Sequence, residues 1–224
     1  MREQKTGGRI LLADDHRLLA EACKGLLEPE FQVVGIMTDG RSLIHSAVEL
    51  KPDIIILDIG MPHLNGLDAG AQVKRKLPGI KLIFLTMNMD TEIAAEAFRR
   101  GASAFVPKQS AADELLTAVR KVKQGLSYLS PLIAQEAFTY LLRQEKRTSE
   151  EKRLTERQSE VLQLLAEGMS MKEVANIIDV TPGTVAFHKY RMMETLNIKT
   201  NAALLEYAFK RHMTPVSGIV DSLA

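Results

Sequence analysis

The feature of this chain that most constrains its fold is a repeated alternation of short apolar runs with helix-length amphipathic stretches. The runs cover Ile10–Ala13, Phe31–Met37, Ile54–Leu57, Lys81–Thr86 and Ala104–Val106. The third run is apolar at every position, as a central parallel strand covered by helices on both faces must be. Five strand–helix repeats with right-handed crossovers predict an open, doubly wound α/β sheet of the (βα)5 type.

The second half of the chain has a purely helical pattern. No strand-like run follows Val106, which argues against one large α/β enzyme that continues the repeats. After Gly125 we expect a helix over about 132–142 and then a solvated linker with the sequence RQEKRTSEEKR. The chain therefore divides into an α/β part and an all-α part.

Helix-start signals mark the all-α part. Thr155 and Ser170 each stand three residues before a Gln or Glu, which is the spacing of a capping box. Thr181 precedes Pro182, the order expected of an N-cap followed by Pro at the first helical position. With a sharp turn at Gly168, these signals predict four short helices in about 60 residues.

The composition excludes several classes of protein. Apolar residues make up 46% of the chain, which is enough to fill a core, and the net charge of +1 gives no sign of nucleic-acid binding. A single Cys excludes a disulfide framework and a Cys-based zinc finger. The N-terminus lacks the apolar middle of a signal peptide, and no apolar run approaches the ~20 residues that cross a bilayer. We therefore expect a soluble, cytoplasmic protein with no membrane contact.

Four of the predicted strands end in side chains that suit metal or phosphate chemistry. Asp14 and Asp15 follow the first strand, Asp58 ends the third, Thr86 ends the fourth and Lys108 follows the fifth. Ligands of doubly wound sheets bind beyond the carboxyl ends of the strands, so these side chains meet at one edge. An isolated strand-end Asp is usually a helix cap. Three carboxylates at one edge instead favour a cation among them, and their oxygens suit Mg²⁺.

Hydrolysis, phosphoryl transfer and binding alone are all open to such a metal site. The chain has no GxxxxGK[ST] phosphate loop. Two residues after Asp58, where a phosphatase with an Asp nucleophile usually carries a second Asp, the chain has Gly60. The pattern favours an Asp58 that accepts a phosphoryl group and keeps it, with Lys108 paired to a phosphate oxygen.

Four motifs resemble those of response-regulator receiver domains in order and spacing: LLADDH at 11–16, LDIGMPHLNG at 57–66, LT at 85–86 and FVPK at 105–108. The resemblance covers roughly residues 8–125 and implies a flavodoxin-like fold. It implies that Asp58 is the phosphoacceptor and that Asp14, Asp15, Asp58 and the Gly60 carbonyl hold Mg²⁺. It further implies a sensor histidine kinase as donor, Thr86 and Phe105 as a switch pair, and Gly66 as a turn glycine.

The stretch from Thr181 to Leu196 has the pattern of a helix with one buried face. Val185, His188 and Met192 share that face with Leu196. The preceding turn-linked stretch, Met171–Ile178, gives the pair helix-turn-helix dimensions, with the second helix suited to a major groove. A plain helical docking or dimerisation module fits the same pattern.

Residues 154–198 resemble the LuxR-type helix-turn-helix of the NarL/FixJ regulators, through LT at 154–155, EVL at 160–162, EG at 167–168, KEVA at 172–175, TV at 184–185 and His188. The resemblance implies a DNA-binding domain whose base-edge contacts are Ala186, Phe187 and Tyr190. Its candidate phosphate contacts are Thr184, Lys189, Arg191 and Lys199.

The all-α part is electrically neutral. Between Leu154 and Met213 it has seven Lys or Arg and seven Asp or Glu. Because backbone affinity grows with the number of phosphates neutralised, one copy should bind DNA weakly and a homodimer is expected. For the stripe formed by Ala203, Leu204, Tyr207 and Ala208 we favour a subunit contact over a core.

The sequence thus predicts a phosphorylation-dependent DNA-binding transcription regulator of a two-component system. The expected divisions are a receiver domain at 8–125, a helical and charged linker at 126–153, a helix-turn-helix domain at 154–213 and a tail at 214–224. Control by protein contact without phosphorylation and a metal-dependent phosphatase are the alternatives. We expect no enzyme in the ordinary sense, because Asp58 accepts a group and lacks an intrinsic general acid for turnover.

Overall fold

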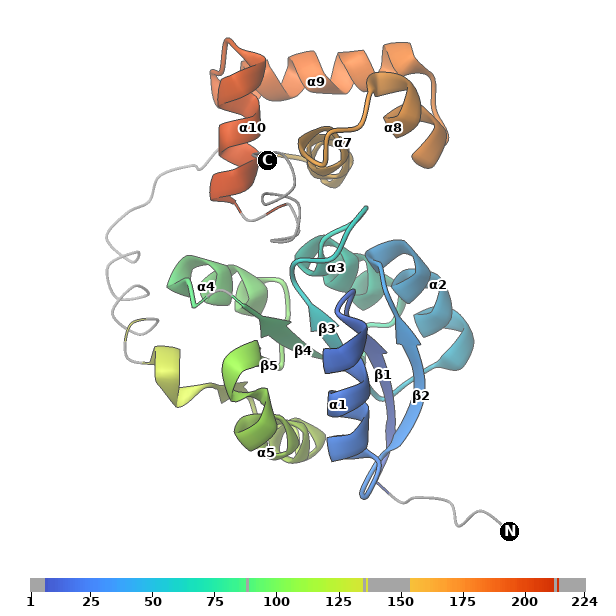
Figure 1. Cartoon of the computed structure of the whole chain (residues 1–224), viewed down its shortest axis with the longest axis vertical. Helices are drawn as coiled ribbons and strands as arrows, with labels where there is room; N and C mark the ends of the chain where they lie inside the picture. The colour runs from blue at the N-terminus through green and yellow to red at the C-terminus, as the bar shows by residue number, and fades with distance from the viewer. Residues whose placement is uncertain (1–6, 88, 135, 137–153, 212, 214–224) are drawn as a thin grey trace.

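The computed structural model describes residues 7–87, 89–134, 136, 154–211 and 213. Most of the helix expected at 132–142, the charged segment before Leu154 and the tail from 214 lie outside the described residues. The described residues form an α/β domain and a separate helical domain (Figure 1). Among them there is no helix with the length and apolar character needed to span a membrane.

The α/β domain is built on a parallel sheet with the strand order β2-β1-β3-β4-β5-β6. Its strands are β1 Arg9–Ala13, β2 Gln32–Met37, β3 Ile54–Asp58, β4 Lys81–Thr86, β5 Ala104–Pro107 and β6 Tyr128–Leu129. The first five confirm the predicted runs. The expectation that no strand follows Val106 was wrong, because β6 pairs with β5 in parallel. Two residues are too short to produce a recognisable strand pattern.

Helices cover both faces of this sheet, which confirms the doubly wound prediction. Helices α1 (Arg17–Leu27) and α5 (Ala111–Lys123) pack on one face. Helices α2 (Gly40–Leu50), α3 (Gly66–Lys76) and α4 (Thr91–Arg99) pack on the other. The central strand β3 is buried throughout, and its residues alternate between the two apolar cores.

The helical domain consists of α7 Glu156–Ala166, α8 Met171–Ile177, α9 Pro182–Leu196 and α10 Asn201–Lys210. Both predicted capping boxes are present, at Thr155 and at Ser170. The Thr181 hydroxyl accepts a hydrogen bond from the Thr184 amide at the start of α9, with Pro182 in the first turn. Gly168 has a φ of +87° in the turn between α7 and α8. Helices α7, α8 and α9 therefore begin where their local signals predict.

The expected subunit contact on α10 was wrong for two of its four residues, whereas Ala203 and Tyr207 are partly exposed. Leu204 and Ala208 are buried in the core of the helical domain with Val161, Val174 and Val185, so they are unavailable as a subunit contact. Periodicity alone does not distinguish an apolar stripe that faces the domain's own core from one that faces a partner.

The helical domain lies beyond the edge of the sheet at which the parallel strands end (Figure 1). Helix α7 is on the side nearest the α/β domain, and α9 is on the far side. The loop 59–65, between β3 and α3, projects toward α7 and bonds to it.

Candidate functional site

Three carboxylates and one imidazole meet at the carboxyl edge of the sheet. Asp14, Asp15 and His16 follow β1, and Asp58 is the last residue of β3, the strand beside it. One potential ligand atom from each of these four residues lies within 4.8 Å of the others. The predicted gathering of acidic side chains at this edge is therefore present in the structure.

Lys108 connects the two buried carboxylates of this cluster. Its Nζ lies 2.7 Å from Oδ2 of Asp58 and 2.9 Å from Oδ2 of Asp14, and all three side chains are buried. Burial raises the pKa of Asp58 above its ordinary value, against the lowering effect of the Lys108 charge. Burial by itself lowers the pKa of Lys108, but Asp58 and Asp14 more than offset this and the net shift is upward. The pairing offsets part of the cost of burying both charges.

The acidic cluster fits a hard divalent cation. Oδ2 of Asp14 and Oδ1 of Asp15 are buried and accept no hydrogen bond among the described residues. They lie 2.9 Å from Lys108 Nζ and from His16 Nδ1, respectively, without the geometry of a hydrogen bond. Carboxylate oxygens that lack a donor are the ligands that Mg²⁺ and Ca²⁺ prefer. The donor set therefore suits a cation bound by Asp14, Asp15 and Asp58.

Thr86 and Phe105 lie on neighbouring strands near this cluster. Thr86 is the last residue of β4 and is buried. Phe105 is in β5, opposite Phe84, and its ring is fully buried in the core beneath α3 and α4. The structure thus places the predicted hydroxyl at the carboxyl edge and the predicted ring one layer below it.

The loop that follows Asp58 packs tightly on the end of β3. The Gly60 amide donates to the Asp58 carboxylate, which lowers the pKa of that group and partly opposes the effect of burial. A Cβ at Gly66 would lie 2.0 Å from the backbone oxygen of Asp58. The Gly66 amide donates to the Ile59 carbonyl over 2.9 Å, which closes the loop on itself. Only glycine allows this close approach, so the predicted turn glycine has a clear steric cause.

Two features of the site were missed by sequence reasoning. The sequence predicts no role for His16, yet its Nδ1 lies 2.9 Å from Asp15 and 3.4 Å from Asp14. Its position directly after an acidic pair at a strand end was the available signal. The second feature is the contact between α7 and the loop 59–65, whose only trace in the sequence is a polar stripe along α7.

Helix α9 has one buried face and one open face, as predicted. Val185 and Met192 are buried in the core of the helical domain, and Leu196 packs against that core. On the other face Phe187 and Tyr190 are 60% and 67% exposed. Gly183 has open space around it in the first turn, where only the Thr181 hydroxyl approaches. The helix therefore offers a large exposed surface, and α9 itself lies on the side of the helical domain away from the α/β domain (Figure 1).

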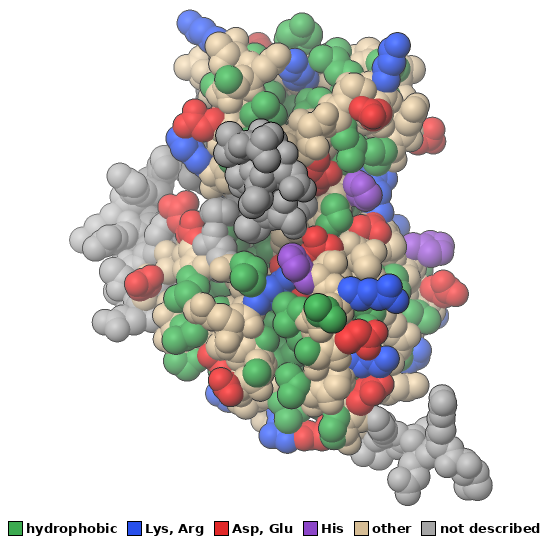
Figure 2. Space-filling model, viewed as in Figure 1, with side chains coloured by type: hydrophobic (Ala, Val, Ile, Leu, Met, Phe, Trp, Pro, Cys, Tyr) green, Lys and Arg blue, Asp and Glu red, His purple; other side chains and the backbone are tan. Residues whose placement is uncertain are grey.

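The candidate DNA contacts lie on and just after α9. Ala186, Lys189 and Thr184 are partly exposed, Arg191 is exposed and pairs with Glu194 at 2.6 Å, and Lys199 is exposed beyond the helix end at Asn197. On the visible face of the helical domain, Lys and Arg side chains intermingle with Asp, Glu and hydrophobic ones (Figure 2). This mixture agrees with the neutral charge of the domain.

Comparisons with known proteins match both parts of the chain. Residues 10–120 match the model of the response regulator receiver domain. Residues 152–208 match the model of bacterial regulatory proteins of the luxR family.

Relatives match over nearly the whole length of the chain. The response regulator protein VraR of Staphylococcus aureus is 30% identical over 207 residues, which are 92% of this chain and 98% of that protein. A structure of the RcsB response regulator of Salmonella typhimurium has a TM-score of 0.62 and 28% identity, covering 90% of this chain and 96% of that one. A structure of RcsB from Salmonella enterica serovar Typhimurium, bound to a promoter in the presence of the phosphomimetic BeF3−, has a TM-score of 0.57 and 27% identity, covering 90% and 98%.

Proposed function

The chain belongs to the response regulators that join a receiver domain to a LuxR-type DNA-binding domain, and from that premise we propose that phosphorylation of Asp58 controls its binding to DNA. We assign the receiver domain to 8–125, the linker to 126–153 and the DNA-binding domain to 154–213. The family consists of DNA-binding transcription regulators rather than enzymes, so the phosphatase alternative is set aside. Because its partner is DNA, we place its action in the cytoplasm.

The observation that carries the proposal is the convergence of Asp58, Lys108 and the acidic pair at one edge of the sheet. A carboxylate oxygen of Asp58 attacks the phosphorus of a sensor kinase's phosphohistidine, the P–N bond breaks, and the imidazole leaves with a proton. Lys108, already 2.7 Å from Asp58, holds an oxygen of the transferred group. Asp14, Asp15, Asp58 and the Gly60 carbonyl would hold Mg²⁺, which would supply positive charge against the negative charge of that group.

Thr86 and Phe105 are the proposed switch pair. Phosphorylation adds about −1.5 to −2 charge and strong acceptor oxygens, which favour arrangements that bring a hydroxyl donor to them. The Thr86 hydroxyl moves to the phosphoryl group, and the Phe105 ring follows by changing its orientation. Moving such an equilibrium from 1:99 to 99:1 takes about 5.5 kcal/mol of differential binding, which a charged pair, a hydroxyl and a cation together approach.

DNA recognition is assigned to α9. Its exposed residues Phe187 and Tyr190, with Ala186, meet base edges by apolar contact, and the phosphate contacts are Thr184, Lys189, Arg191 and Lys199. The RcsB–DNA complexes support this assignment for a relative of the same architecture. Because the domain is neutral, two copies acting as a homodimer supply the affinity that one copy lacks.

The test is the intact mass of the full chain after incubation with Mg²⁺ and acetyl phosphate, beside Asp58→Asn. We expect one added phosphoryl group that depends on Mg²⁺ and is absent in the variant. DNA binding and dimerisation are then compared before and after phosphorylation, and both should increase. A chain that gains no mass from acetyl phosphate or from phosphorylated sensor kinases, yet binds DNA, would indicate control by protein contact alone.

A further inference from the structure

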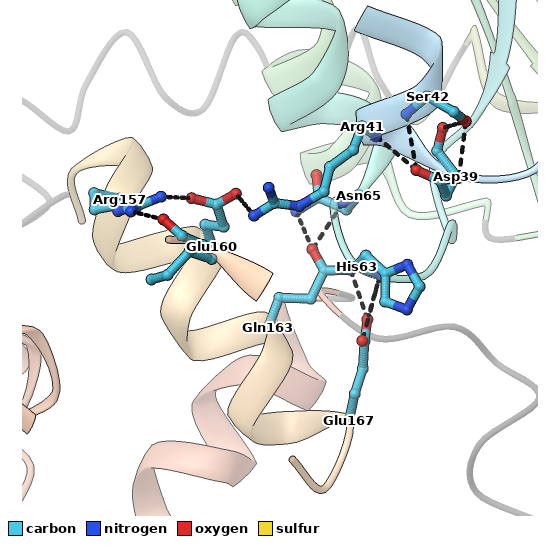
Figure 3. Close-up of polar contacts among 10 residues, drawn as sticks. Asp39, Arg41, Ser42, His63, Asn65, Arg157, Glu160, Gln163 and Glu167 are labelled. Atoms are coloured by element: carbon cyan, nitrogen blue, oxygen red, sulfur yellow. Dashed lines mark hydrogen bonds and ion pairs between the residues drawn. The ribbon is translucent and has the colours of Figure 1, made fainter. Parts of the chain in front are cut away.

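The two domains meet through a buried amide side chain. Gln163 of α7 is 0% exposed, and every hydrogen-bonding position of its amide is used (Figure 3). Its Oε1 accepts from the Asn65 amide nitrogen at 2.7 Å and from Asn65 Nδ2 at 3.1 Å. Its Nε2 donates to the Met61 carbonyl at 3.0 Å and to Glu167 at 2.8 Å. Three of these four bonds bind the loop that follows Asp58, so the contact is geometrically specific.

A second bond holds the tip of the same loop. The His63 amide donates to the two carboxylate oxygens of Glu167, over 3.1 and 3.3 Å (Figure 3). His63 has a φ of +64°, a left-handed conformation that is uncommon for a residue other than glycine. Glu167 belongs to the DNA-binding domain and His63 to the receiver domain. The bond between them therefore lets one domain stabilise an unfavourable backbone conformation in the other.

These contacts lie along one face of α7 and its C-cap residue, Glu167. Glu156, Glu160, Gln163 and Glu167 follow one another at spacings of four, three and four residues, which places them on one side of a helix. Glu156 pairs with Arg75 of α3, and Glu160 pairs with Arg41 of α2. We call these four side chains and their receiver partners the α7 interface.

The loop 59–65 connects Asp58 directly to this interface. It begins directly after Asp58, and Gly66 at its end packs against the Asp58 backbone with no room for a Cβ. Asp58 is 4% exposed, so a phosphoryl group added to it needs space that the surrounding groups must give. Hydrogen bonds from Gln163 and Glu167 hold the backbone of Met61, His63 and Asn65, and so they resist a movement of the loop that would make this space.

Docking does not cover the DNA-reading surface. Helix α9 is on the far side of the helical domain, with Phe187 and Tyr190 exposed (Figure 1). The α7 interface therefore restricts the loop beside Asp58 and leaves the exposed surface of α9 uncovered.

We propose that the docked DNA-binding domain restrains the loop 59–65 and thereby slows the acceptance of a phosphoryl group by Asp58, with Gln163 as the positioning residue. The inference rests on the proposed function. By linkage, phosphorylation weakens docking by the same factor by which docking disfavours the phosphorylated form. The DNA-binding domain is thus a regulator of the receiver domain as well as its target.

The test uses the full chain as wild type, Gln163→Ala and Glu167→Ala. Hydrogen–deuterium exchange without phosphodonor should be faster in both variants over residues 59–66, where the His63 and Asn65 amides are the donors. The initial rate of mass gain with Mg²⁺ and acetyl phosphate should rise about fivefold in Gln163→Ala, because a loop released from α7 lowers the barrier to the reaction at Asp58. Glu167→Gln, which keeps an acceptor oxygen for the His63 amide, should restore most of the exchange protection that Glu167→Ala loses.

Asn176→Ala, at an exposed position of α8, is the matched control and should change neither readout. Unchanged exchange in Gln163→Ala would overturn the docking contact. Faster exchange with an unchanged or slower rate of mass gain would overturn the control of phosphorylation. If the wild type itself gains no mass, the proposed function fails, whereas an active wild type with an unchanged variant overturns only this inference.

Discussion

At the scale of single residues, the site depends on positions where no other side chain fits. Gly66 begins α3 at the point where the chain passes over the end of β3, and a Cβ there would meet the backbone oxygen of Asp58 at 2.0 Å. Because the obstacle is backbone rather than a flexible side chain, the clash is relieved only by moving the loop or the strand. The close approach therefore couples the loop to Asp58, the proposed phosphoacceptor.

Replacing Gly66 by Ala should destabilise the receiver domain by about 3 kcal/mol, because the added methyl group displaces backbone that is already packed. The urea midpoint of the receiver transition measures this loss. Gly79→Ala is the control, since a Cβ at Gly79 meets no atom within 4 Å. Equal midpoints for the two variants would show that the loop yields without cost.

At the scale of elements, the helical domain is specified by its helix starts. Thr155 and Ser170 form capping boxes, and Thr181 caps α9 through the Thr184 amide. The start of α9 sets which residues face the core and which remain exposed, because one residue of displacement rotates the helix by about 100°. A cap at this position therefore fixes the orientation of the proposed reading face.

Thr181→Ala should cost about 1 kcal/mol, because the Thr184 amide loses its acceptor. This lowers the thermal midpoint of the helical domain by about 4–8 °C. Differential scanning calorimetry of the full chain measures the shift, and Thr181→Ser, which retains the hydroxyl, should show little change. A midpoint equally lowered by Ser would assign the effect to the lost methyl group instead of the cap.

At the scale of the whole molecule, charge balance sets how DNA is bound. The helical domain has equal numbers of acidic and basic residues, so we expect DNA binding to depend on local cations on and after α9. The proposed phosphate contacts Lys189, Arg191 and Lys199 would give three ionic contacts per copy and six per dimer. The salt dependence of binding then reports the number of copies on the DNA.

For a dimer, the slope of log K against log salt on a duplex DNA should be about −5, because each neutralised phosphate contributes about −0.9. Lys189→Ala should reduce its magnitude by roughly 2, one contact being lost from each copy. Fluorescence anisotropy over a salt series measures both slopes, with Lys76→Ala of the receiver domain as control. A wild-type slope near −3 would indicate binding by a single copy.

Much of the fold and of the receiver site was predictable because the signals are local. Ile54–Leu57 reads as a buried strand from its own four residues, and Asp58 follows it directly. Parallel strands bring their ends to one edge, so the meeting of Asp14, Asp58 and Lys108 followed from strand order alone. The two-residue strand β6 and the burial of Leu204 were not predictable, since each depends on what packs beside it.

The sequence by itself determined the two domain types, the helix caps, the buried strands and the cluster around Asp58, because periodicity and capping act over a few residues. Only the tertiary structure decided which face of the helical domain meets the receiver. Gln163 and Asn65 are 98 residues apart, and no short-range pattern states that a polar stripe on one helix will be satisfied by a distant loop. The face that meets the receiver is decided by two surfaces that match in shape and hydrogen bonding. Each of these surfaces exists only after its domain has folded.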